Sequence, residues 1–501
     1  MDRETGFKNV PDALLQRLSE YLTAKIGLQF QEKNRDDLHR KMTSAMTDFG
    51  FEDVVGFIEW LLSMSLTQEQ IEILASHLTV GETYFFREKN IFETLEHSIL
   101  PGLIDARRKT GKRLRCWSAG CSTGEEAYSI AILLDKLIPD LKDWNVTIIA
   151  TDINAFALRR AGEGIYSGWS FRDTPPFFKD KYFERVNENR YRLLPNIRKM
   201  VTFSYLNLSE DVYPALQTNT NAMDFIFCRN VLMYFAPDYI RRTTERFYRS
   251  LVEGGFLVVS PVETSQMYYA QYTTVRLRDS IFYKKDTVKI KQEDKIEKHV
   301  EIVTTPPPAQ KVKRSTSKKL LHTGRYDISK KPAGQALTPY EEADIFYEKG
   351  LYREAEERLG PIVSNGRSSP EALVLYTKIL ANQGKLEDAF HWCEKAVSAD
   401  RSNAYPHYLL AVILEEQGRL EDARASLKRA IYLDHNFALA YFALANLSLR
   451  LGKIAEARKH FGNTAEILSK YKPDEIIPES EGITARRFSE MISAVHLKEL
   501  Q

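Results

Sequence analysis

The sequence predicts a multidomain protein with an all-α N-terminal domain, an α/β domain built on a largely parallel sheet, and an all-α superhelix of repeats. Apolar residues follow helical spacing alone in residues 1–92, whereas short apolar runs alternate with helical segments in residues 93–285. Beyond residue 338 a glycine recurs every 34 residues, which is typical of stacked helical repeats. A chain of 501 residues has room for about three such parts.

The composition excludes several classes of protein. Lys and Arg number 70 against 68 Asp and Glu, a net charge of +2, and 43% of residues are apolar, so neither whole-chain disorder nor a nucleic-acid partner is expected. No apolar run reaches the ~18 residues of a membrane span, and the first ten residues lack the apolar core of a signal peptide. We therefore expect a cytoplasmic protein that is not integral to a membrane. The four cysteines form no CxxC pair and no HExxH occurs, so we expect no metal site.

The N-terminal domain is expected to be helical, because Leu14, Leu18 and Leu22 share one face of a helix. A group of basic residues, interrupted by Asp36 and Asp37, follows in the sequence. It could steer an acidic partner toward the domain, although an ordinary solvated helix face explains it equally well. Its members are Lys33, Arg35, Arg40 and Lys41.

The α/β domain is expected to contain five strands separated by helical segments. Each strand is a short apolar run that ends in polar or glycine residues, as in buried parallel sheets. A hairpin-like stretch at residues 191–195 indicates an insertion between the second and third strands. The predicted strands are residues 114–117, 146–150, 201–206, 225–227 and 256–259.

A tight glycine turn at residues 118–124 joins the first predicted strand to a helix. It has neither the GxGxxG of dinucleotide binders nor the Lys-Ser/Thr of a P-loop, so a diphosphate or triphosphate is not the obvious ligand. Glu125 and Glu126 begin the helix instead. Carboxylates beside free backbone N–H groups favour a ligand with both an ammonium and a carboxylate, such as an amino acid moiety. The alternative is that the two glutamates only complement the helix dipole.

The ends of the other strands suggest the rest of this ligand. Asp152 ends the second strand, where its carboxylate can accept hydrogen bonds from a ribose diol. Asn207 and Leu208 close the third strand and could bracket an adenine. An amino acid end and a ribose together describe S-adenosylmethionine, and residues 224–235 bring polar groups to the edge above its sulfonium.

Four segments resemble, in order and spacing, the signature motifs of the CheR-type chemotaxis receptor methyltransferases: residues 83–87, 120–126, 150–153 and 228–235. One position departs from the pattern, because Gly81 stands where some members have an asparagine. The resemblance covers residues 10–285. It implies a helical N-terminal domain joined to a Rossmann-like class I methyltransferase domain, methylation of receptor glutamates, and a small β insertion at about 165–200 that docks a receptor tail in some members.

The resemblance also implies the residues of the site. Arg87 and Tyr234 would lie closest to the transferred methyl group as catalytic residues. The cofactor S-adenosylmethionine would be contacted by Thr83, Arg87, Glu126, Asp152, Asn207, Leu208, Cys228 and Arg229.

A glutamate acceptor agrees with the residue types in these motifs. Its side chain, with a reference pKa of about 4.3, is already ionised at pH 7. Transfer therefore needs alignment and a dry site rather than proton removal, and no histidine lies in any of the four motifs. Arg87 could hold the acceptor carboxylate or that of the cofactor, and Tyr234 could orient the attacking oxygen. The alternative for Tyr234 is a core aromatic.

Residues 286–337 are expected to form a flexible basic linker, since they hold 12 Lys and Arg against 6 Asp and Glu and include three consecutive prolines. A linker of this kind transmits little stiffness. We therefore expect residues 1–285 and residues 338–501 to fold as separate units.

The repeats occupy residues 338–471 and resemble the tetratricopeptide repeat. Four glycines, Gly350, Gly384, Gly418 and Gly452, keep the 34-residue period, and an alanine follows each one five residues later. The concave surface of such a superhelix usually holds a peptide or partner helix. In the C-terminal tail, 472–501, residues 483–497 are expected to form an amphipathic helix that caps the last repeat or acts as a detachable partner segment.

We interpret the sequence as that of a protein-glutamate O-methyltransferase of a bacterial chemosensory pathway. Its substrate would be a methyl-accepting chemoreceptor, itself membrane-bound, and its repeats would bind an unidentified protein or peptide. The first alternative is a small-molecule methyltransferase, against which the helical N-terminal domain argues. The second is a non-catalytic scaffold that presents the repeats. The presence of all the main expected site residues argues against a non-catalytic scaffold. These residues are Arg87, Glu126, Asp152, Asn207 and Tyr234.

Overall fold

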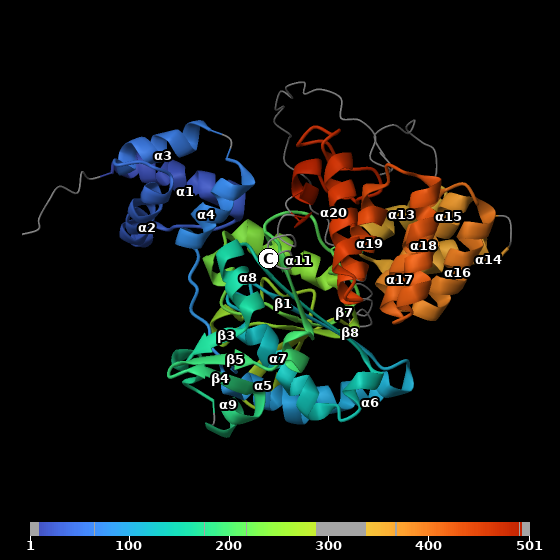
Figure 1. Cartoon of the computed structure of the whole chain (residues 1–501), viewed down its shortest axis with the longest axis horizontal. Coiled ribbons are helices and arrows are strands. Elements are labelled where there is room, and N and C mark those ends of the chain that lie inside the picture. The colour runs from blue at the N-terminus through green and yellow to red at the C-terminus, as the bar shows by residue number, and fades with distance from the viewer. Residues whose placement is uncertain are drawn as a thin grey trace, which may run out of the picture.

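The computed structural model describes residues 10–286 and 337–492, except residues 65, 175, 217, 366, 367 and 490. A helical N-terminal domain, an α/β domain and an array of paired helices are arranged around a common centre (Figure 1). The predicted linker, apart from its first and last residues, lies outside the described residues, as do residues 493–497 of the predicted terminal helix. None of the described helices is long and apolar enough to cross a membrane.

The N-terminal domain is a cluster of four helices around its own apolar core, as predicted. Leu18 and Leu22 are fully buried, together with Ile58 from a neighbouring helix. The Asp53 carboxylate accepts a hydrogen bond from Gly56 N at 2.8 Å and so caps the third helix. The elements are α1 (Asp12–Ile26), η1 (Glu32–Asn34), α2 (Arg35–Asp48), α3 (Val54–Ser63) and α4 (Gln68–Leu78).

The central sheet has seven strands in the order β6-β2-β1-β7-β8-β10-β9. The first five run parallel, which confirms the predicted strands, and β10 adds the antiparallel pair that the sequence analysis did not predict. The carboxyl ends of β1, β2, β6 and β7 therefore meet at one edge of the sheet. The strands are β1 (Arg113–Ala119), β2 (Asn145–Asp152), β6 (Val201–Tyr205), β7 (Met223–Phe227), β8 (Leu251–Val258), β9 (Thr273–Leu277) and β10 (Ser280–Lys284).

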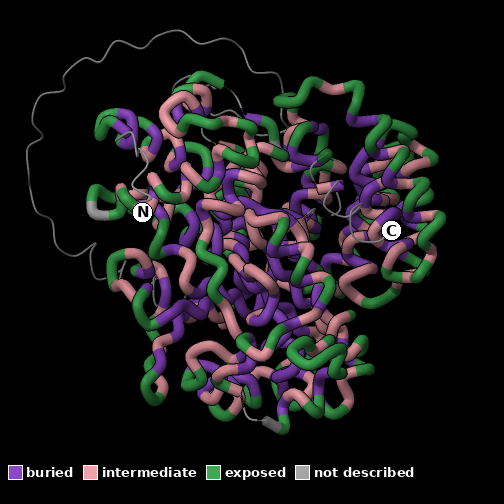
Figure 2. The backbone as a smooth tube through the Cα atoms, turned by 60° about the vertical axis from the view of Figure 1, so that its left-hand side comes forward, coloured by how far each residue is buried: buried purple, intermediate pink, exposed green. Residues whose placement is uncertain are grey.

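Helices cover both faces of the sheet. Cys116 and Trp117, neighbours on β1, are buried in different cores, one packed with α7 and the other with α11. The buried residues of this domain accordingly lie at its centre (Figure 2). The helices are α5 (Lys89–Thr94), η2 (Leu95–Ile99), α6 (Leu100–Lys109), α7 (Glu125–Leu137), η3 (Leu141–Asp143), α8 (Ala155–Glu163), η5 (Leu232–Tyr234), α11 (Pro237–Ser250) and η6 (Pro261–Glu263).

The predicted β insertion is present as a separate three-stranded antiparallel sheet in the order β3-β5-β4. It packs on the α/β domain through aromatic contacts such as the stacked rings of Phe85 and Phe171, whose centroids are 5.2 Å apart. Its elements are β3 (Ile165–Ser167), η4 (Gly168–Phe171), α9 (Pro176–Tyr182), β4 (Phe183–Asn187), β5 (Arg190–Leu193) and α10 (Pro195–Arg198).

The C-terminal helices form four pairs with the predicted period. Each of the four periodic glycines has a φ between 70° and 77°, a left-handed conformation that ends the first helix of its pair. The alanine five residues later is fully buried in every repeat. The pairs are α13 (Pro339–Glu348) with α14 (Tyr352–Ser364), α15 (Pro370–Asn382) with α16 (Leu386–Ala399), α17 (Ala404–Glu416) with α18 (Leu420–Leu433), and α19 (Ala438–Arg450) with α20 (Ile454–Leu468).

The repeats dock against the amino ends of the central strands, which the sequence analysis did not predict. Glu416 at the end of α17 forms ion pairs with Arg115 and with Arg113, the latter at 2.9 Å. Asn145 at the start of β2 donates a hydrogen bond to the backbone oxygen of Glu416. Arg249 donates to Glu348 O at the end of α13, at 3.2 Å. The repeats thus contact the sheet edge opposite the carboxyl ends, while separate folding of the two parts stays a prediction.

Candidate active site

A cavity lies between the N-terminal domain and the carboxyl edge of the sheet. It is lined by nearly all the predicted site residues, although they come from five separate parts of the chain. Cys228 does not line it, because its side chain is fully buried beneath the strand end. The predicted residues that line the cavity are Thr83, Arg87, Glu126, Asp152, Asn207, Leu208, Arg229 and Tyr234.

The glycine turn has a shape that only glycine allows at Gly120. Gly120 has a φ of 82°, and a Cβ placed there would lie 2.4 Å from Cγ2 of Val231. The turn is tied to β2 because Gly120 N and Cys121 N donate to Thr151 O at 2.7 and 3.0 Å. The backbone can therefore approach a ligand closely at this point.

Asp152 organises the same turn from the end of β2. One carboxylate oxygen accepts from Ser122 N and the other from Asn154 N, both at 2.8 Å. Burial raises the pKa of Asp152, and these backbone hydrogen bonds oppose the rise. Each carboxylate oxygen has a second lone pair, so the side chain can still accept hydrogen bonds from a diol in the cavity.

The two glutamates that begin α7 have different surroundings. Glu125 is buried against the β insertion, where Thr123 and Ser170 donate to its carboxylate at 2.6 and 3.0 Å. Glu126 lines the cavity and accepts from the Ser118 hydroxyl at 2.7 Å. Only Glu126 is therefore placed to contact a ligand.

Arg229 forms ion pairs with Glu126 and with a further acidic residue, Glu88. Its guanidinium lies 3.1 Å from Glu126 and 3.0 Å from Glu88, and it also donates to Arg87 O. Its buried Nε has no hydrogen-bond partner among the described residues. A cavity lined by the Glu126 carboxylate and the Arg229 guanidinium fits a ligand that carries both an ammonium and a carboxylate, as an amino acid moiety does.

Several residues around the cavity have a strained backbone conformation. Phe86, Glu88, Ser122 and Asn230 all have a φ between 48° and 59°, which is costly for residues with a Cβ. Such strain, roughly 1–3 kcal/mol each, persists where the surroundings over-determine the backbone, commonly at functional sites. Here it holds Arg87 between two strained residues at the cavity wall.

The sequence analysis missed two carboxylates that support the site. Glu263 accepts hydrogen bonds from Asn230 N and Val231 N at 2.6 and 2.8 Å and so shapes the loop that follows β7. Glu88 accepts from the Ser260 hydroxyl at 2.7 Å while it pairs with Arg229. The Ser-x-x-Glu spacing of residues 260–263 was a readable capping signal for Glu263, whereas nothing in the sequence singled out Glu88.

Tyr234 and Arg87 both line the cavity and are at least partly exposed to solvent. Tyr234 is 38% exposed, so the alternative of a core aromatic is wrong. Its backbone oxygen accepts from Gln29 N at 2.8 Å, which ties the loop to the N-terminal domain. Arg87 Nη1 donates to Glu82 O at 2.7 Å. Both side chains are thus reachable by a group that enters from outside.

The side-chain amide of Asn207 is already hydrogen-bonded within the protein, which the sequence analysis did not predict. Its amide nitrogen donates to Lys25 O at 3.2 Å and to the Glu210 carboxylate at 3.1 Å, while its oxygen accepts from Ser209 N at 3.0 Å. In this structure the side chain joins α1 to the loop after β6. Leu208 forms an apolar part of the wall beside it.

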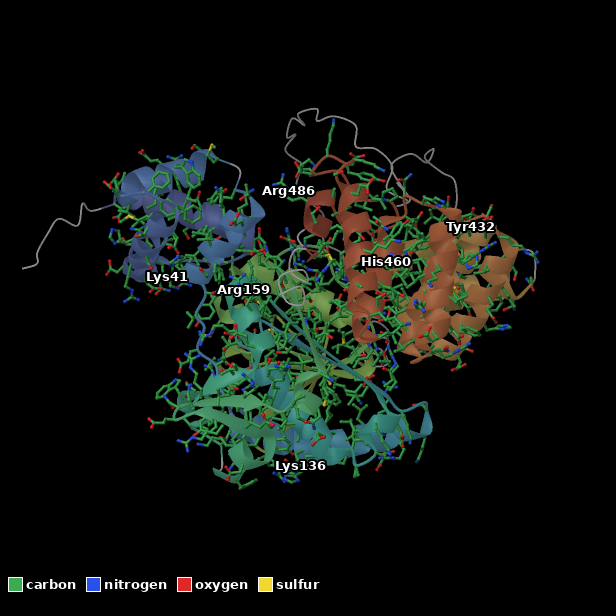
Figure 3. All side chains as sticks on the ribbon, in the orientation of Figure 1. Lys41, Lys136, Arg159, Tyr432, His460 and Arg486 are labelled. Atoms are coloured by element: carbon green, nitrogen blue, oxygen red, sulfur yellow. The ribbon has the colours of Figure 1, made fainter. Side chains whose placement is uncertain are left out.

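The basic group of the N-terminal domain is largely paired. Arg35 lies 3.2 Å from Asp12, and Arg40 lies 2.5 Å from Asp37. Lys41, at the edge of the domain nearest the α/β domain (Figure 3), pairs with Asp37 at 3.2 Å and lines the cavity. These ion pairs favour the interpretation of a solvated helix face for α2, and the side chain of Lys33 lies outside the described residues.

Comparison with known proteins agrees with this geometry. Residues 81–278 match the family model of the CheR methyltransferase, SAM binding domain. The chain is 32% identical over 276 residues to chemotaxis protein methyltransferase 2 of Vibrio cholerae, which covers 55% of this chain and 94% of that protein. The chain belongs to the CheR methyltransferase family. It is also 30% identical over 258 residues to the chemotaxis protein methyltransferase of Borreliella burgdorferi, covering 51% of this chain and 89% of that protein.

This CheR-family chain also resembles relatives beyond the catalytic part. A 26% identical match over 436 residues to the probable biofilm formation methyltransferase WspC of Pseudomonas putida covers 77% of this chain and 99% of that protein. Residues 413–452 match a TPR repeat model, and residues 348–430 match the model of anaphase-promoting complex, cyclosome, subunit 3. The family assignment implies S-adenosylmethionine as the ligand of the cavity.

Proposed function

We propose that this chain transfers the methyl group of S-adenosylmethionine to glutamate side chains of chemoreceptor-type proteins in a bacterial chemosensory pathway. The observation that carries the proposal is that Arg87 and Tyr234, both at least partly exposed, line the same cavity as Glu126, Asp152 and Arg229. An acceptor side chain can therefore reach Arg87 and Tyr234 from outside. The tetratricopeptide repeats serve to bind a protein partner or to regulate the enzyme.

The residues of the site can serve this chemistry without a general base. When bound, S-adenosylmethionine supplies an electrophilic methyl group. Among the described residues, no histidine lines the cavity, and a carboxylate acceptor has no proton to lose at neutral pH. Arg87 can hold the acceptor carboxylate by a charge-assisted hydrogen bond, and Tyr234 can orient its oxygen. The site thus acts by alignment.

The test is transfer of radiolabelled methyl groups to candidate chemoreceptors. A methyl ester of glutamate is base-labile, so the label should appear as volatile methanol after mild alkali. Label that stays on the receptor in alkali would contradict a glutamate ester. Label found only on small molecules would support the alternative of a small-molecule methyltransferase.

Tyr234→Phe should lower kcat by about tenfold, because the attacking oxygen loses the hydrogen bond that orients it, with little change in cofactor affinity. Arg87→Ala should reduce both turnover and binding. Steady-state kinetics with a receptor substrate measure this, and Tyr432→Phe, on an exposed residue of the repeats (Figure 3), is the control. Equal turnover of Tyr234→Phe and the parent enzyme would remove Tyr234 from the chemical step.

A further inference from the structure

Residues 472–492 return across the repeats instead of only capping the last one. We call the surface formed by the first helices of the four pairs, α13, α15, α17 and α19, the groove. Ile476 and Thr484 form an antiparallel bridge, so residues 476–484 make a narrow hairpin, followed by a short helical turn at 485–489. The helix predicted over 483–497 therefore begins at residue 485 instead, and the tip of the hairpin before it lies against the first two repeats.

The hairpin tip places one carboxylate in the groove. Glu481 lies 2.5 Å from the ammonium of Lys378 on α15 and accepts a hydrogen bond from the Tyr347 hydroxyl on α13 at 3.2 Å. Lys378 also lies over the ring of Tyr347, with its Nζ 4.7 Å from the centroid. Glu481 has a φ of 57°, a strained conformation that the hairpin maintains.

The groove requires an acidic occupant. Only 16% of the Lys378 side chain is exposed. Burial by itself lowers the pKa of Lys378, but the Glu481 carboxylate outweighs this and holds the pKa well above its usual value. A buried ammonium that loses its carboxylate is strongly disfavoured. Whatever covers this part of the groove must therefore bring a negative charge to the same point.

Apolar residues flank that charge on both sides. Ile477, Ile483 and Phe488 are almost completely buried. The Phe488 ring packs edge-on against Phe442 of α19, with centroids 5.0 Å apart. Arg486 lies on the side of the segment away from the repeats (Figure 3). The pattern that the groove recognises is thus a carboxylate between apolar residues, with an aromatic ring after it.

We propose that the groove binds a segment of a partner protein that presents a carboxylate between apolar residues, and that residues 472–492 are the internal ligand that this partner must displace. The inference builds on the proposed partner-binding role of the repeats. It does not depend on methyl transfer, so its test is independent of the enzymatic assay.

Displacement of residues 472–492 would also change contacts next to the cavity. Arg487 donates to Tyr205 O at 3.5 Å and lies 3.6 Å from the Glu210 carboxylate. Glu210 in turn accepts from the Asn207 amide at 3.1 Å. A partner that lifts the tail therefore removes a contact from the loop that carries Asn207 and Leu208.

The probe is a fluorescent synthetic peptide of residues 472–492, titrated into the full chain and followed by anisotropy. In the parent chain the attached tail competes, so the peptide should bind weakly. In a Phe488→Ala chain the tail is loosened while the residues of the groove stay intact, and the peptide should bind about tenfold more tightly or better. A peptide carrying Glu481→Gln should bind that chain about tenfold more weakly, because it lacks the ionised partner of Lys378.

Lys378→Gln, added to the Phe488→Ala chain, should abolish the difference between the two peptides, whereas Lys459→Gln, at an exposed lysine on α20, should preserve it. Circular dichroism checks that each chain remains helical, and a Glu481→Gln chain replaces Phe488→Ala if the latter unfolds. Equal affinity of a folded, loosened chain for the two peptides would overturn the proposal, as would failure of that chain to bind either.

Discussion

Asp152→Ala should weaken the binding of S-adenosylmethionine by about 1.5–3 kcal/mol, the range for hydrogen bonds to a charged group. The change removes the proposed acceptor for the ribose diol. It also releases Ser122 N and Asn154 N, both of which donate to this carboxylate at 2.8 Å, so the glycine turn loses its anchor to β2. Isothermal titration calorimetry measures the affinity directly.

The matched control is Asp238→Ala, because Asp238 is an exposed aspartate at the start of α11 and does not line the cavity. Its affinity for S-adenosylmethionine should equal that of the parent. A parent-like affinity of Asp152→Ala would contradict the assignment of Asp152 to the ribose.

Glu416→Gln should destabilise the contact between the repeats and the central sheet by about 3 kcal/mol, since removing one partner of a buried ion pair leaves the other charge uncompensated. The uncompensated charge is that of Arg115, whose side chain is fully buried. Glu394→Gln, at an exposed glutamate of α16, is the control. Hydrogen exchange at the amides of β1 and α17, together with urea unfolding, should report the loss.

The ion pair between Glu416 and Arg115 also makes the contact between the repeats and the central sheet sensitive to acid. Burial alone raises the pKa of Glu416, but Arg115 and Arg113 outweigh it and bring the pKa to about 2, below its ordinary value of 4.5. A lowered carboxylate pKa stabilises the folded state above the ordinary value and ceases to do so as pH falls through the lowered one. In the parent chain this stabilisation, about 3 kcal/mol, should therefore fade between pH 4.5 and 2. It should be missing at all pH values in Glu416→Gln, and identical pH profiles for the two chains would show that Glu416 does not stabilise the contact.

Much of the site could be predicted because its residues follow strand ends. Gly120 directly follows β1, Asp152 is the last residue of β2, and Asn207 lies two residues after the end of β6. Parallel strands bring such positions to one edge of the sheet. Glu88 and Glu263 escaped prediction, because their role depends on contacts with Arg229 and with the loop after β7, 141 and 30 to 33 residues away. The buried side chain of Cys228 was not predictable either, since a position within a motif does not decide whether a side chain faces the cavity.

The sequence by itself determined the three parts of the chain, the strands, the repeat period and the chemistry of the cavity wall. Periodicity, glycine conformation and strand endings depend on residues that are close along the chain, so they can be read without a fold. Only the tertiary structure decided that the repeats dock on the amino edge of the sheet and that Glu481 occupies the groove. Arg113 and Glu416 are 303 residues apart, and Tyr347 and Glu481 are 134 apart. Such pairs meet only once helices and strands have packed, because burial and charge compensation act on neighbours in space.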